Sequence, residues 1–217
     1  MIARHSVLIF VVALAAARAD DGTSPPRLKP RPVNYGTAGS ATPRWPERIA
    51  LHDPGSKDAL WAQKSFDHST WKTMKVPSHF DTTELPGFDG VVWFRKTVEL
   101  SLEQTTVAAT LHLGQIDDMD VTWVNGTRVG GYENPGHHYT VRKYPIPAGL
   151  LKTGKNVITV RVMDHGSPGG IAGKPEQLSL QLGKETVSLA NTWHFAPGAN
   201  LEALNKQAAL VGLKLAN

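Results

Sequence analysis

Short stretches of alternating or β-branched residues recur along the middle of the chain and predict β-strands. An extended backbone points successive side chains to opposite faces, so alternation marks a strand that buries one face. Between Trp71 and Ala190, each such stretch has the length of a strand and is bounded by turn residues. The stretches are Val91 to Leu100, Val107 to Leu113, Met119 to Val124, Tyr139 to Ile146, Val157 to Met163 and Gln177 to Leu182.

The alternation is clearest in the stretch from Val157 to Val162. Ile158, Val160 and Val162 share one side of an extended backbone, so we expect this strand to bury a single apolar face. Asn125-Gly126 separates two apolar stretches, and both residues tolerate the positive φ angles of a type I′ turn. We therefore expect a tight hairpin from Trp123 to Val129.

The order of these elements predicts an all-β fold. Too few helical patterns lie between the strands to build βαβ units, so we expect antiparallel sheets packed face to face as a sandwich over residues 46–195. Residues 196–217 are expected to add a short amphipathic helix capped by Asn200. Its apolar stripe would dock on the sandwich or on a partner domain; the stripe comprises Leu201, Leu204, Ala208, Val211 and Leu215.

The first 45 residues differ in character from the rest. Arg4 and His5 precede an apolar stretch, and Ala17-Arg18-Ala19 supplies the small residues that a signal peptidase reads. We expect residues 1–19 to be removed and the mature chain to be secreted or periplasmic, because the apolar stretch is too short for a comfortable membrane span. Residues 20–45 are rich in proline and are expected to form a semi-extended linker.

Composition excludes several kinds of chemistry. The chain of 217 residues has no cysteine, which rules out a disulfide framework, a thiolate nucleophile and a cysteine-based metal site. Its 23 Lys and Arg residues nearly balance 19 Asp and Glu residues, and no basic run is present. There is accordingly no electrostatic case for nucleic-acid binding.

Several ordered motifs resemble a known family. Phe66 to Trp71, Val76-Pro77, Val92 to Lys96 and Asn125 to Gly130 resemble the galactose-binding-like jelly roll that serves as the sugar-binding domain of family 2 glycoside hydrolases. A narrower set is similar to the domain inserted within bacterial sialate O-acetylesterases: Leu85 to Arg95, Leu113 to Asp120 and Gly169 to Gln177. The resemblance implies a galactose-binding-like jelly roll with an accessory role in glycan processing.

The catalytic part of those esterases is not found here. Their nucleophilic serine lies in a Gly-Gln-Ser-Asn-like block, whereas Gly114-Gln115 is followed by Ile116. Asp164, His165 and Ser167 provide the residue types of a catalytic triad, but the strand–turn–helix setting of a nucleophile elbow is lacking. We interpret residues 164–169 as a glycine-rich loop and predict no catalytic residue in this chain.

Acidic residues lead into one predicted strand. Asp117, Asp118 and Asp120 are expected first to cap a turn, with a sugar contact and a structural calcium site as the second and third alternatives. No other cofactor is expected. Adjacent residues on a strand point to opposite faces, so we expect His137 and His138 to diverge, one exposed and one packed, and not to form a metal pair.

Two longer loops carry the candidate ligand-binding residues. They run from Tyr132 to His138 and from Asp164 to Lys174, where polar side chains stand beside glycines that let a ligand approach. Sugar recognition combines an aromatic face with hydrogen-bonding groups at its edge. The candidates are Tyr132, Glu133, Asn134, His137, Asp164 and Lys174, whereas Trp71 and Trp93 are expected in the core.

These observations favour a non-catalytic module that binds carbohydrate, such as a sialylated or galactosylated glycan, or that supports a catalytic partner domain. Two alternatives stay open. The chain could be a fragment of a sialate O-acetylesterase-like or family 2-like hydrolase, or a structural module for protein interaction.

Overall fold

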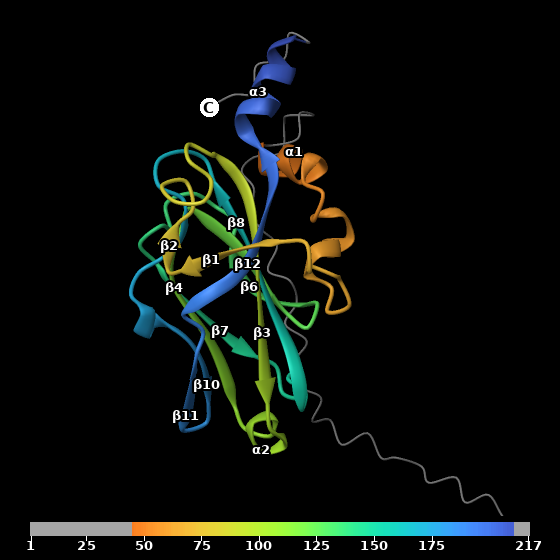
Figure 1. Ribbon diagram of the computed structural model, residues 1–217, viewed down its shortest axis with the longest axis vertical. Helices are drawn as coiled ribbons and strands as arrows, with labels where there is room; N and C mark the ends of the chain where they lie inside the picture. The colour runs from red at the N-terminus through yellow and green to blue at the C-terminus, as the bar shows by residue number, and fades with distance from the viewer. Residues whose placement is uncertain (1–44, 211–217) are drawn as a thin grey trace, which may run out of the picture. The chain divides into compact units, whose positions relative to one another are not determined.

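The computed structural model describes residues 45–210 of the chain (Figure 1). The predicted signal peptide and nearly all of the predicted linker lie outside the described residues. Within 45–210, no helix is both long and apolar enough to span a lipid bilayer.

Two antiparallel sheets confirm the predicted all-β sandwich. The first has the strand order β1-β12-β3-β8-β5-β6, and the second has the order β11-β10-β4-β9-β2, with β7 pairing on the other side of β4. The first sheet comprises β1 (Lys72–Val76), β12 (Asn191–Asn200), β3 (Gly90–Leu100), β8 (Gly154–Asp164), β5 (Met119–Val124) and β6 (Thr127–Tyr132). The second comprises β11 (Glu185–Ser188), β10 (Leu178–Leu182), β4 (Ala109–Asp117), β9 (Gly170–Ala172), β2 (Ser78–His79) and β7 (Val141–Ile146).

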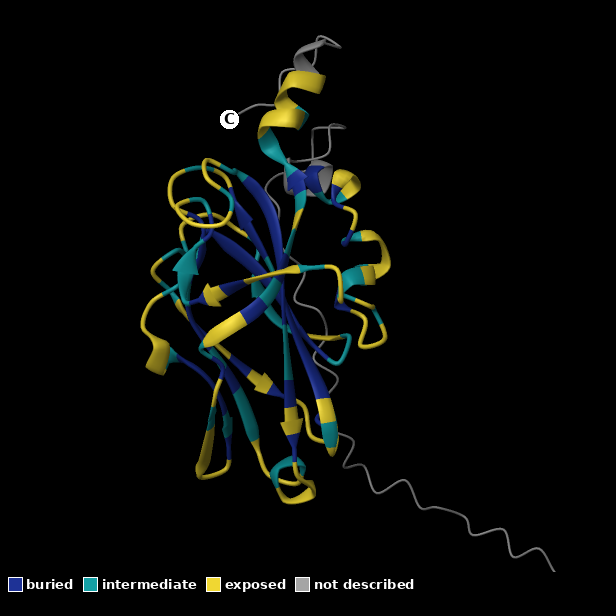
Figure 2. Cartoon of the chain, in the orientation of Figure 1, coloured by how far each residue is buried: buried dark blue, intermediate teal, exposed yellow. Residues whose placement is uncertain are grey.

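The main core lies between the two sheets. Val92 and Phe94 of β3 and Val160 of β8 belong to the same buried cluster as Leu111 of β4 and Leu180 of β10. Figure 2 shows these central strands as dark blue, with the exposed residues concentrated in turns and edge strands. Burial of this apolar surface on both sheets is the main force that holds the sandwich together.

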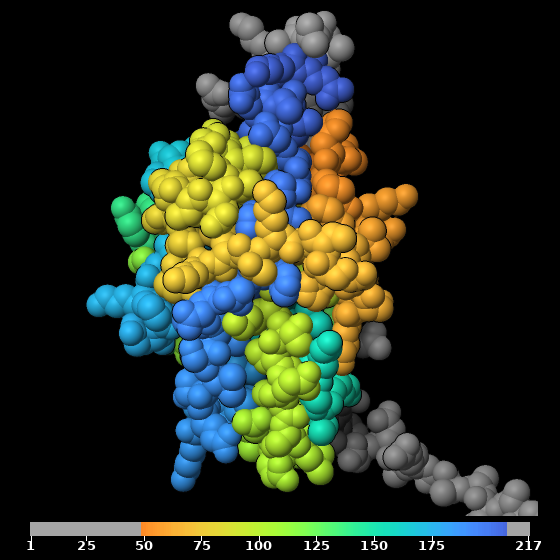
Figure 3. All heavy atoms as spheres, in the orientation of Figure 1, coloured from red at the N-terminus to blue at the C-terminus, as the bar shows by residue number. Residues whose placement is uncertain are grey.

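A second core covers the outer face of the first sheet. It joins Trp93 of β3 and Trp123 of β5 to Ile49 of helix α1 (Trp45–His52) and Ala62 of the 3₁₀ segment η1 (Lys57–Ala62). Figure 3 shows the segment 45–71 lying along one side of the sandwich. The expectation that β8 buries a single face is therefore wrong, because Val157 and Thr159 on its other face are also buried.

Polar contacts fasten this covering segment to the sheet. The indole nitrogen of Trp93, buried as predicted, donates to both carboxylate oxygens of Asp53 at 3.0 Å. The guanidinium of Arg95 donates to the backbone carbonyls of Trp61 and Gln63. Trp71 is only half buried and packs against the second core.

The predicted hairpin and helix cap are both present. Asn125 and Gly126 adopt φ angles of 50° and 82° between β5 and β6, as a type I′ turn requires. Strand β12 continues to Asn200, and helix α3 (Leu201–Leu210) follows, which confirms the short C-terminal helix. The Asn200 side-chain oxygen accepts the backbone N–H of Ala203 at 2.8 Å.

Helix α3 packs against the second core through its first turn. Leu201 and Leu204 contact that cluster. The other three residues of the predicted apolar stripe lie outside the region whose side chains the structure describes.

Strand pairing brings several loops to one end of the sandwich, which we call the acidic end. Gly90 pairs with Asp164, Met119 pairs with Met163, and Asp117 pairs with Gly170. The acidic end therefore carries the loops 80–89, 133–140 and 165–169 together with the crossing at Asp117–Asp118, where the chain passes between the sheets. Helix α2 (Leu102–Thr105) follows β3 at the opposite end.

Candidate functional site

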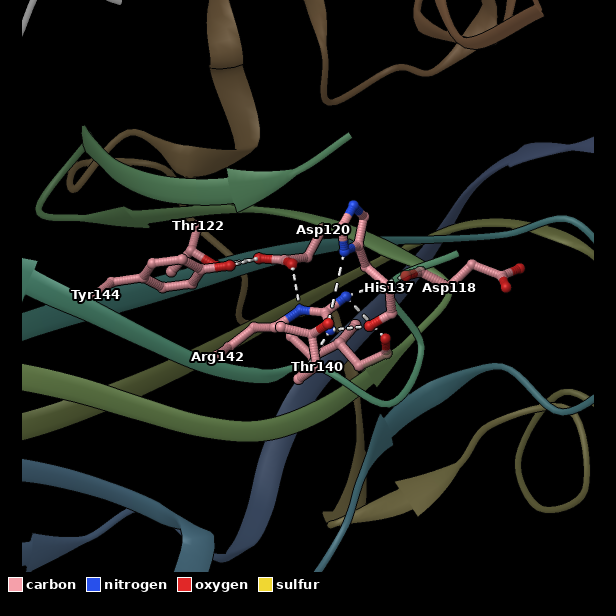
Figure 4. A network of polar contacts seen from close by, with 8 residues as sticks. Asp118, Asp120, Thr122, His137, Thr140, Arg142 and Tyr144 are labelled. Carbon is pink, nitrogen blue, oxygen red and sulfur yellow. Dashed lines mark hydrogen bonds and ion pairs between the residues drawn. The ribbon is translucent and has the colours of Figure 1, made fainter. Parts of the chain in front are cut away.

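A buried polar network organises the acidic end (Figure 4). Its centre is an ion pair between Arg142 of β7 and Asp120 of β5, with Nε and Oδ1 2.9 Å apart and both side chains fully buried. The other carboxylate oxygen of Asp120 accepts the hydroxyls of Tyr144 at 2.8 Å and Thr122 at 2.9 Å. Burial raises the pKa of the Asp120 carboxyl, while the guanidinium and the two hydroxyls oppose that shift.

Arg142 uses the rest of its donors to hold the surrounding backbone. Nη1 donates to the carbonyls of His137 at 2.5 Å and Thr140 at 2.6 Å, and Nη2 donates to those of Ile116 at 2.9 Å and Asp118 at 3.0 Å. All five guanidinium N–H groups can therefore be satisfied by protein oxygens. As a result, the loop 133–140 and the crossing at Asp117–Asp118 are fixed to one side chain.

This arrangement brings together three side chains of the types that can bind a metal ion. One ligand atom each from Asp117, Asp118 and His138 lies within 4.8 Å of the other two. Asp118 is buried, whereas Asp117 and His138 are half buried. Burial and the neighbouring carboxyl of Asp118 raise the pKa of Asp117, and His138 and His79 act in the opposite direction.

The loop 165–169 contacts the same cluster from the other side. Asp118 Oδ2 accepts the backbone N–H of His165 at 3.1 Å and lies 3.3 Å from the Nδ1 atom of that imidazole. Asp118 thus lies between the two loops that were predicted to bind a ligand.

Asp164, at the end of β8, is fully buried. Its Oδ1 accepts the N–H of Gly166 at 3.0 Å, and its Oδ2 has no hydrogen-bond partner. Burial raises the pKa of Asp164 to about 7, and the carboxylates of Asp118, Asp89 and Asp81 add to that rise. Asp164 therefore holds a proton far more readily than an exposed aspartate.

The triad residue types in this loop do not form a triad in series. Asp164 contacts Gly166 rather than the imidazole of His165, which lies beside Asp118. Ser167 is exposed and has a φ angle of 68°. The acid-to-histidine link of a triad is therefore not made by Asp164.

The structure separates the predicted ligand-binding residues into groups. The rings of Tyr132 and His137 pack 4.8 Å apart, and the Arg142 guanidinium lies 4.9 Å from the centre of the Tyr132 ring. Glu133 forms an ion pair with Arg128 at 3.2 Å. Tyr132 and His137 therefore pack against the buried polar network. The carboxylate of Glu133 is paired with the guanidinium of Arg128.

The remaining predicted residues differ in exposure. Asn134 and Lys174 are exposed, and the Lys174 backbone N–H donates to Gln177 at 2.8 Å. Asp164 is closed off from solvent. Of the three acidic residues considered for calcium, Asp120 belongs to the buried network, whereas Asp117 and Asp118 stay together in the cluster.

Some residues of the acidic end were not predicted from sequence. His138 lies in a loop rather than on a strand, so the argument from opposite strand faces does not apply to it. Tyr139 was not singled out, yet its side chain is 79% exposed and its ring lies 4.2 Å from that of His138. A signal for Arg142 was available, because its position alternates with exposed Val141 and Lys143 and places a charged residue on the buried face.

Comparison with known proteins assigns the chain to a family of all-β domains. Residues 45–167 match the family described as the beta-galactosidase second all-beta domain. The match covers more than half of the chain, so the chain belongs to this family. The predicted all-β domain of the family 2 glycoside hydrolase type is confirmed, and the narrower resemblance to the esterase insert stays a prediction.

Individual relatives are much longer than this chain. A β-galactosidase from Arthrobacter sp. (strain B7) is 27% identical over an alignment 128 residues long, and the match covers 46% of this chain and 12% of that protein. A solved glycosyl hydrolase family 2 member from Bacteroides cellulosilyticus DSM 14838 shares 22% identity with a TM-score of 0.44, over 51% of this chain and 17% of its own. A Bacteroides uniformis β-glucuronidase shares 20% identity with a TM-score of 0.42, over 62% and 15% respectively.

Proposed function

We propose that this chain is a non-catalytic accessory domain of a glycoside-hydrolase-type protein and that it binds carbohydrate at the acidic end. The observation that carries the proposal is the family match over residues 45–167, which includes β3 to β8 and the loop 133–140. The family relationship supports an association with glycan processing. The exposed aromatic ring of Tyr139 in the loop 133–140, with an imidazole and a carboxylate beside it, supports a contact with carbohydrate.

Tyr139 offers the surface that a sugar ring would use. Its ring is largely exposed and stands next to His138, which in turn lies by Asp117. Pyranose rings stack their C–H faces on aromatic side chains, and carboxylate and imidazole groups at the edge hydrogen-bond the hydroxyls. We infer that galactosylated or sialylated glycans would bind here, with Tyr139 as the platform and Asp117 and His138 at its edge.

The same domain would support a catalytic partner domain. The chain spans 12% of the length of the β-galactosidase that it matches, so most of such an enzyme would lie in other domains. The esterase-like alternative belongs to this proposal as well, because its catalytic block would also be contributed by another domain. We further propose that the mature protein is exported, on the strength of the signal-peptide pattern in residues 1–19.

Binding is tested by calorimetric titration of the purified chain with a panel of galactosylated and sialylated oligosaccharides. Replacing Tyr139 by Ala removes the aromatic face, and we expect affinity to fall on the order of three- to tenfold. Leu102→Ala is the matched control, because Leu102 is 62% exposed on α2 at the opposite end. Flat titrations across the panel, or equal losses in the two variants, would overturn the carbohydrate proposal.

A separate assay tests the non-catalytic part of the proposal. The wild-type chain is incubated with a chromogenic β-galactoside and with a chromogenic acetate, and we expect no turnover above the rate without protein. A rate that disappears in a Ser167→Ala variant would show that the chain is itself a hydrolase.

A further inference from the structure

We propose that Asp117, Asp118 and His138 form a binding site for a divalent first-row transition-metal cation, with Zn²⁺ as the best fit. The proposal does not depend on carbohydrate binding. It begins from the only group of three or more such ligand residues that converges within the part of the chain that the structure describes.

The spacing of the three side chains is close to that of a metal site. Their ligand atoms lie within 4.8 Å of one another. Ligands about 2.0–2.1 Å from a tetrahedral Zn²⁺ stand roughly 3.4 Å apart, so small side-chain rotations would close the site. Asp117 and His138 are only half buried, so neither side chain is fully enclosed by packed neighbours.

The donor atoms select the kind of cation. Ca²⁺ prefers six to eight oxygen ligands, and Mg²⁺ prefers an octahedron of oxygens. A set of two carboxylates and one imidazole instead suits Zn²⁺ and its first-row neighbours. The sequence grouped Asp120 with Asp117 and Asp118, but in the structure the third ligand of the group is His138. This change of one ligand from a carboxylate to an imidazole changes the expected metal from calcium to zinc.

The ligands are held on a prepared frame. Arg142 donates to the carbonyls of His137 and Thr140, which flank His138 and Tyr139 in the chain, and to the carbonyl of Asp118. On its other side, Asp118 Oδ2 accepts the backbone N–H of His165. A hydrogen bond of this kind holds the ligating carboxylate in one orientation. Less conformational entropy is then lost when the metal ion binds.

A second observation is the buried carboxyl of Asp164 at the acidic end, of which only one oxygen has a hydrogen-bond donor. The side chain of Asp164 is fully buried, and its Oδ2 atom has no hydrogen-bond donor. A buried carboxylate oxygen is normally hydrogen-bonded or paired with a cation. Asp118 is one of the carboxylates whose charge acts on Asp164, so a cation bound by Asp118 would offset the negative charge around both.

The test is calorimetric titration of the full chain, without an affinity tag, with ZnCl₂, CaCl₂ and MgCl₂ in separate experiments. We expect one Zn²⁺ per chain and no comparable binding of Ca²⁺ or Mg²⁺. His138→Ala and Asp117→Asn should each weaken Zn²⁺ binding by at least about tenfold. Circular dichroism of each variant checks that it folds, which the partial exposure of both side chains favours.

Matched controls come from another part of the chain. His68 is half buried and its ring lies 4.8 Å from that of His194, so this pair is a second place where imidazoles could bind Zn²⁺. Asp67 is an exposed aspartate next to it. We expect His68→Ala and Asp67→Asn to leave Zn²⁺ binding unchanged.

Three results would overturn the proposal. They are no measurable Zn²⁺ binding, a loss of binding in His68→Ala instead of His138→Ala, and tighter binding of Ca²⁺ than of Zn²⁺. Cobalt substitution gives an independent readout, because the visible absorption of bound Co²⁺ reports an imidazole–carboxylate site and should disappear in His138→Ala. Since no sugar enters these experiments, their failure would leave the carbohydrate proposal standing.

Discussion

At the scale of single residues, Arg142 connects more parts of the acidic end than any other side chain described above. Its five N–H groups contact Asp120 and four backbone carbonyls that belong to three segments of the chain. Removing one member of a buried ion pair leaves the partner charge without compensation, which is far more costly than losing an exposed pair. The chain contains both a buried ion pair, Arg142 with Asp120, and an exposed one, Arg128 with Glu133.

We predict that Arg142→Met lowers the free energy of unfolding by about 3–5 kcal/mol, because it leaves Asp120 buried and unpaired. Urea denaturation measures the change. Arg128→Met is the control, since Arg128 pairs with Glu133 at an exposed position and its loss should cost less than about 1 kcal/mol. Similar losses in the two variants would show that the buried pair contributes no more than the exposed one.

At the scale of elements, the covering segment 45–71 is the part of the fold that turns a two-layer sandwich into a three-layer structure. Ile49, Ala62 and Trp61 from this segment pack on the outer face of the first sheet, where Trp93, Trp123 and Val121 would otherwise meet water. Exposing a contiguous apolar surface of this kind favours aggregation.

We predict that a chain beginning at residue 72 fails to unfold cooperatively and elutes as aggregates in size-exclusion chromatography. A chain beginning at residue 41 keeps α1 and η1 and serves as the control, for which we expect a monomer with a sharp thermal transition. A well-folded monomer from the shorter chain would mean that the second core is dispensable.

Several strands and the hairpin turn could be predicted from sequence because their signals are local, whereas β1 and β12 of the first sheet were not among the predicted stretches. Met119 to Val124 coincides with β5, Val91 to Leu100 differs from β3 by one residue, and the Asn125-Gly126 hairpin is where the turn chemistry puts it. The second core could not be predicted in the same way. Helix α1 and η1 are short, and their burial depends on a sheet formed by residues far along the chain.

The candidate site was predicted only in part, for the same reason. The predicted loops Tyr132 to His138 and Asp164 to Lys174 both reach the acidic end, although Gly170–Ala172 of the second forms strand β9. Asp118 contacts residues of both segments, through His138 and His165. The meeting of His138 with Asp117 depends on the pairing of β7 with β4 and on Arg142, and neither is visible in local spacing. Exposure also divides the candidates, because Asp164 is buried and Tyr132 is half buried, whereas Asn134 and Lys174 are exposed.

At the scale of the whole molecule, the charge at the acidic end should make stability depend on pH. The pKa of Asp164 is raised from 3.8 to about 7 in the folded chain. Between these values the folded state holds a proton that the unfolded state has released, so this group makes the free energy of unfolding fall as pH rises from about 4 to 7. The fall slows as pH passes 7 and ends about one pH unit higher.

We predict that Asp164→Asn flattens this part of the pH dependence, because an amide does not titrate. Urea denaturation at pH 5 and pH 8 measures the difference for wild type and variant. Asp67→Asn is the control, since its exposed carboxyl has a lowered pKa and cannot produce a fall in this direction. Identical pH slopes in wild type and Asp164→Asn would contradict the assignment.

Under the proposed accessory role, the covering segment also limits where a neighbouring domain could dock. The covering segment occupies the outer face of the first sheet. A neighbouring domain could therefore bind at either end of the sandwich or on the outer face of the second sheet. On that face β7 presents the exposed residues Val141, Lys143 and Pro145. Interfaces between domains are more polar than domain interiors, and the exposed positions of β7 are of that mixed kind. A neighbouring domain would therefore form a partly polar interface with this one. We expect this domain to stay folded in water when it is expressed without that neighbour.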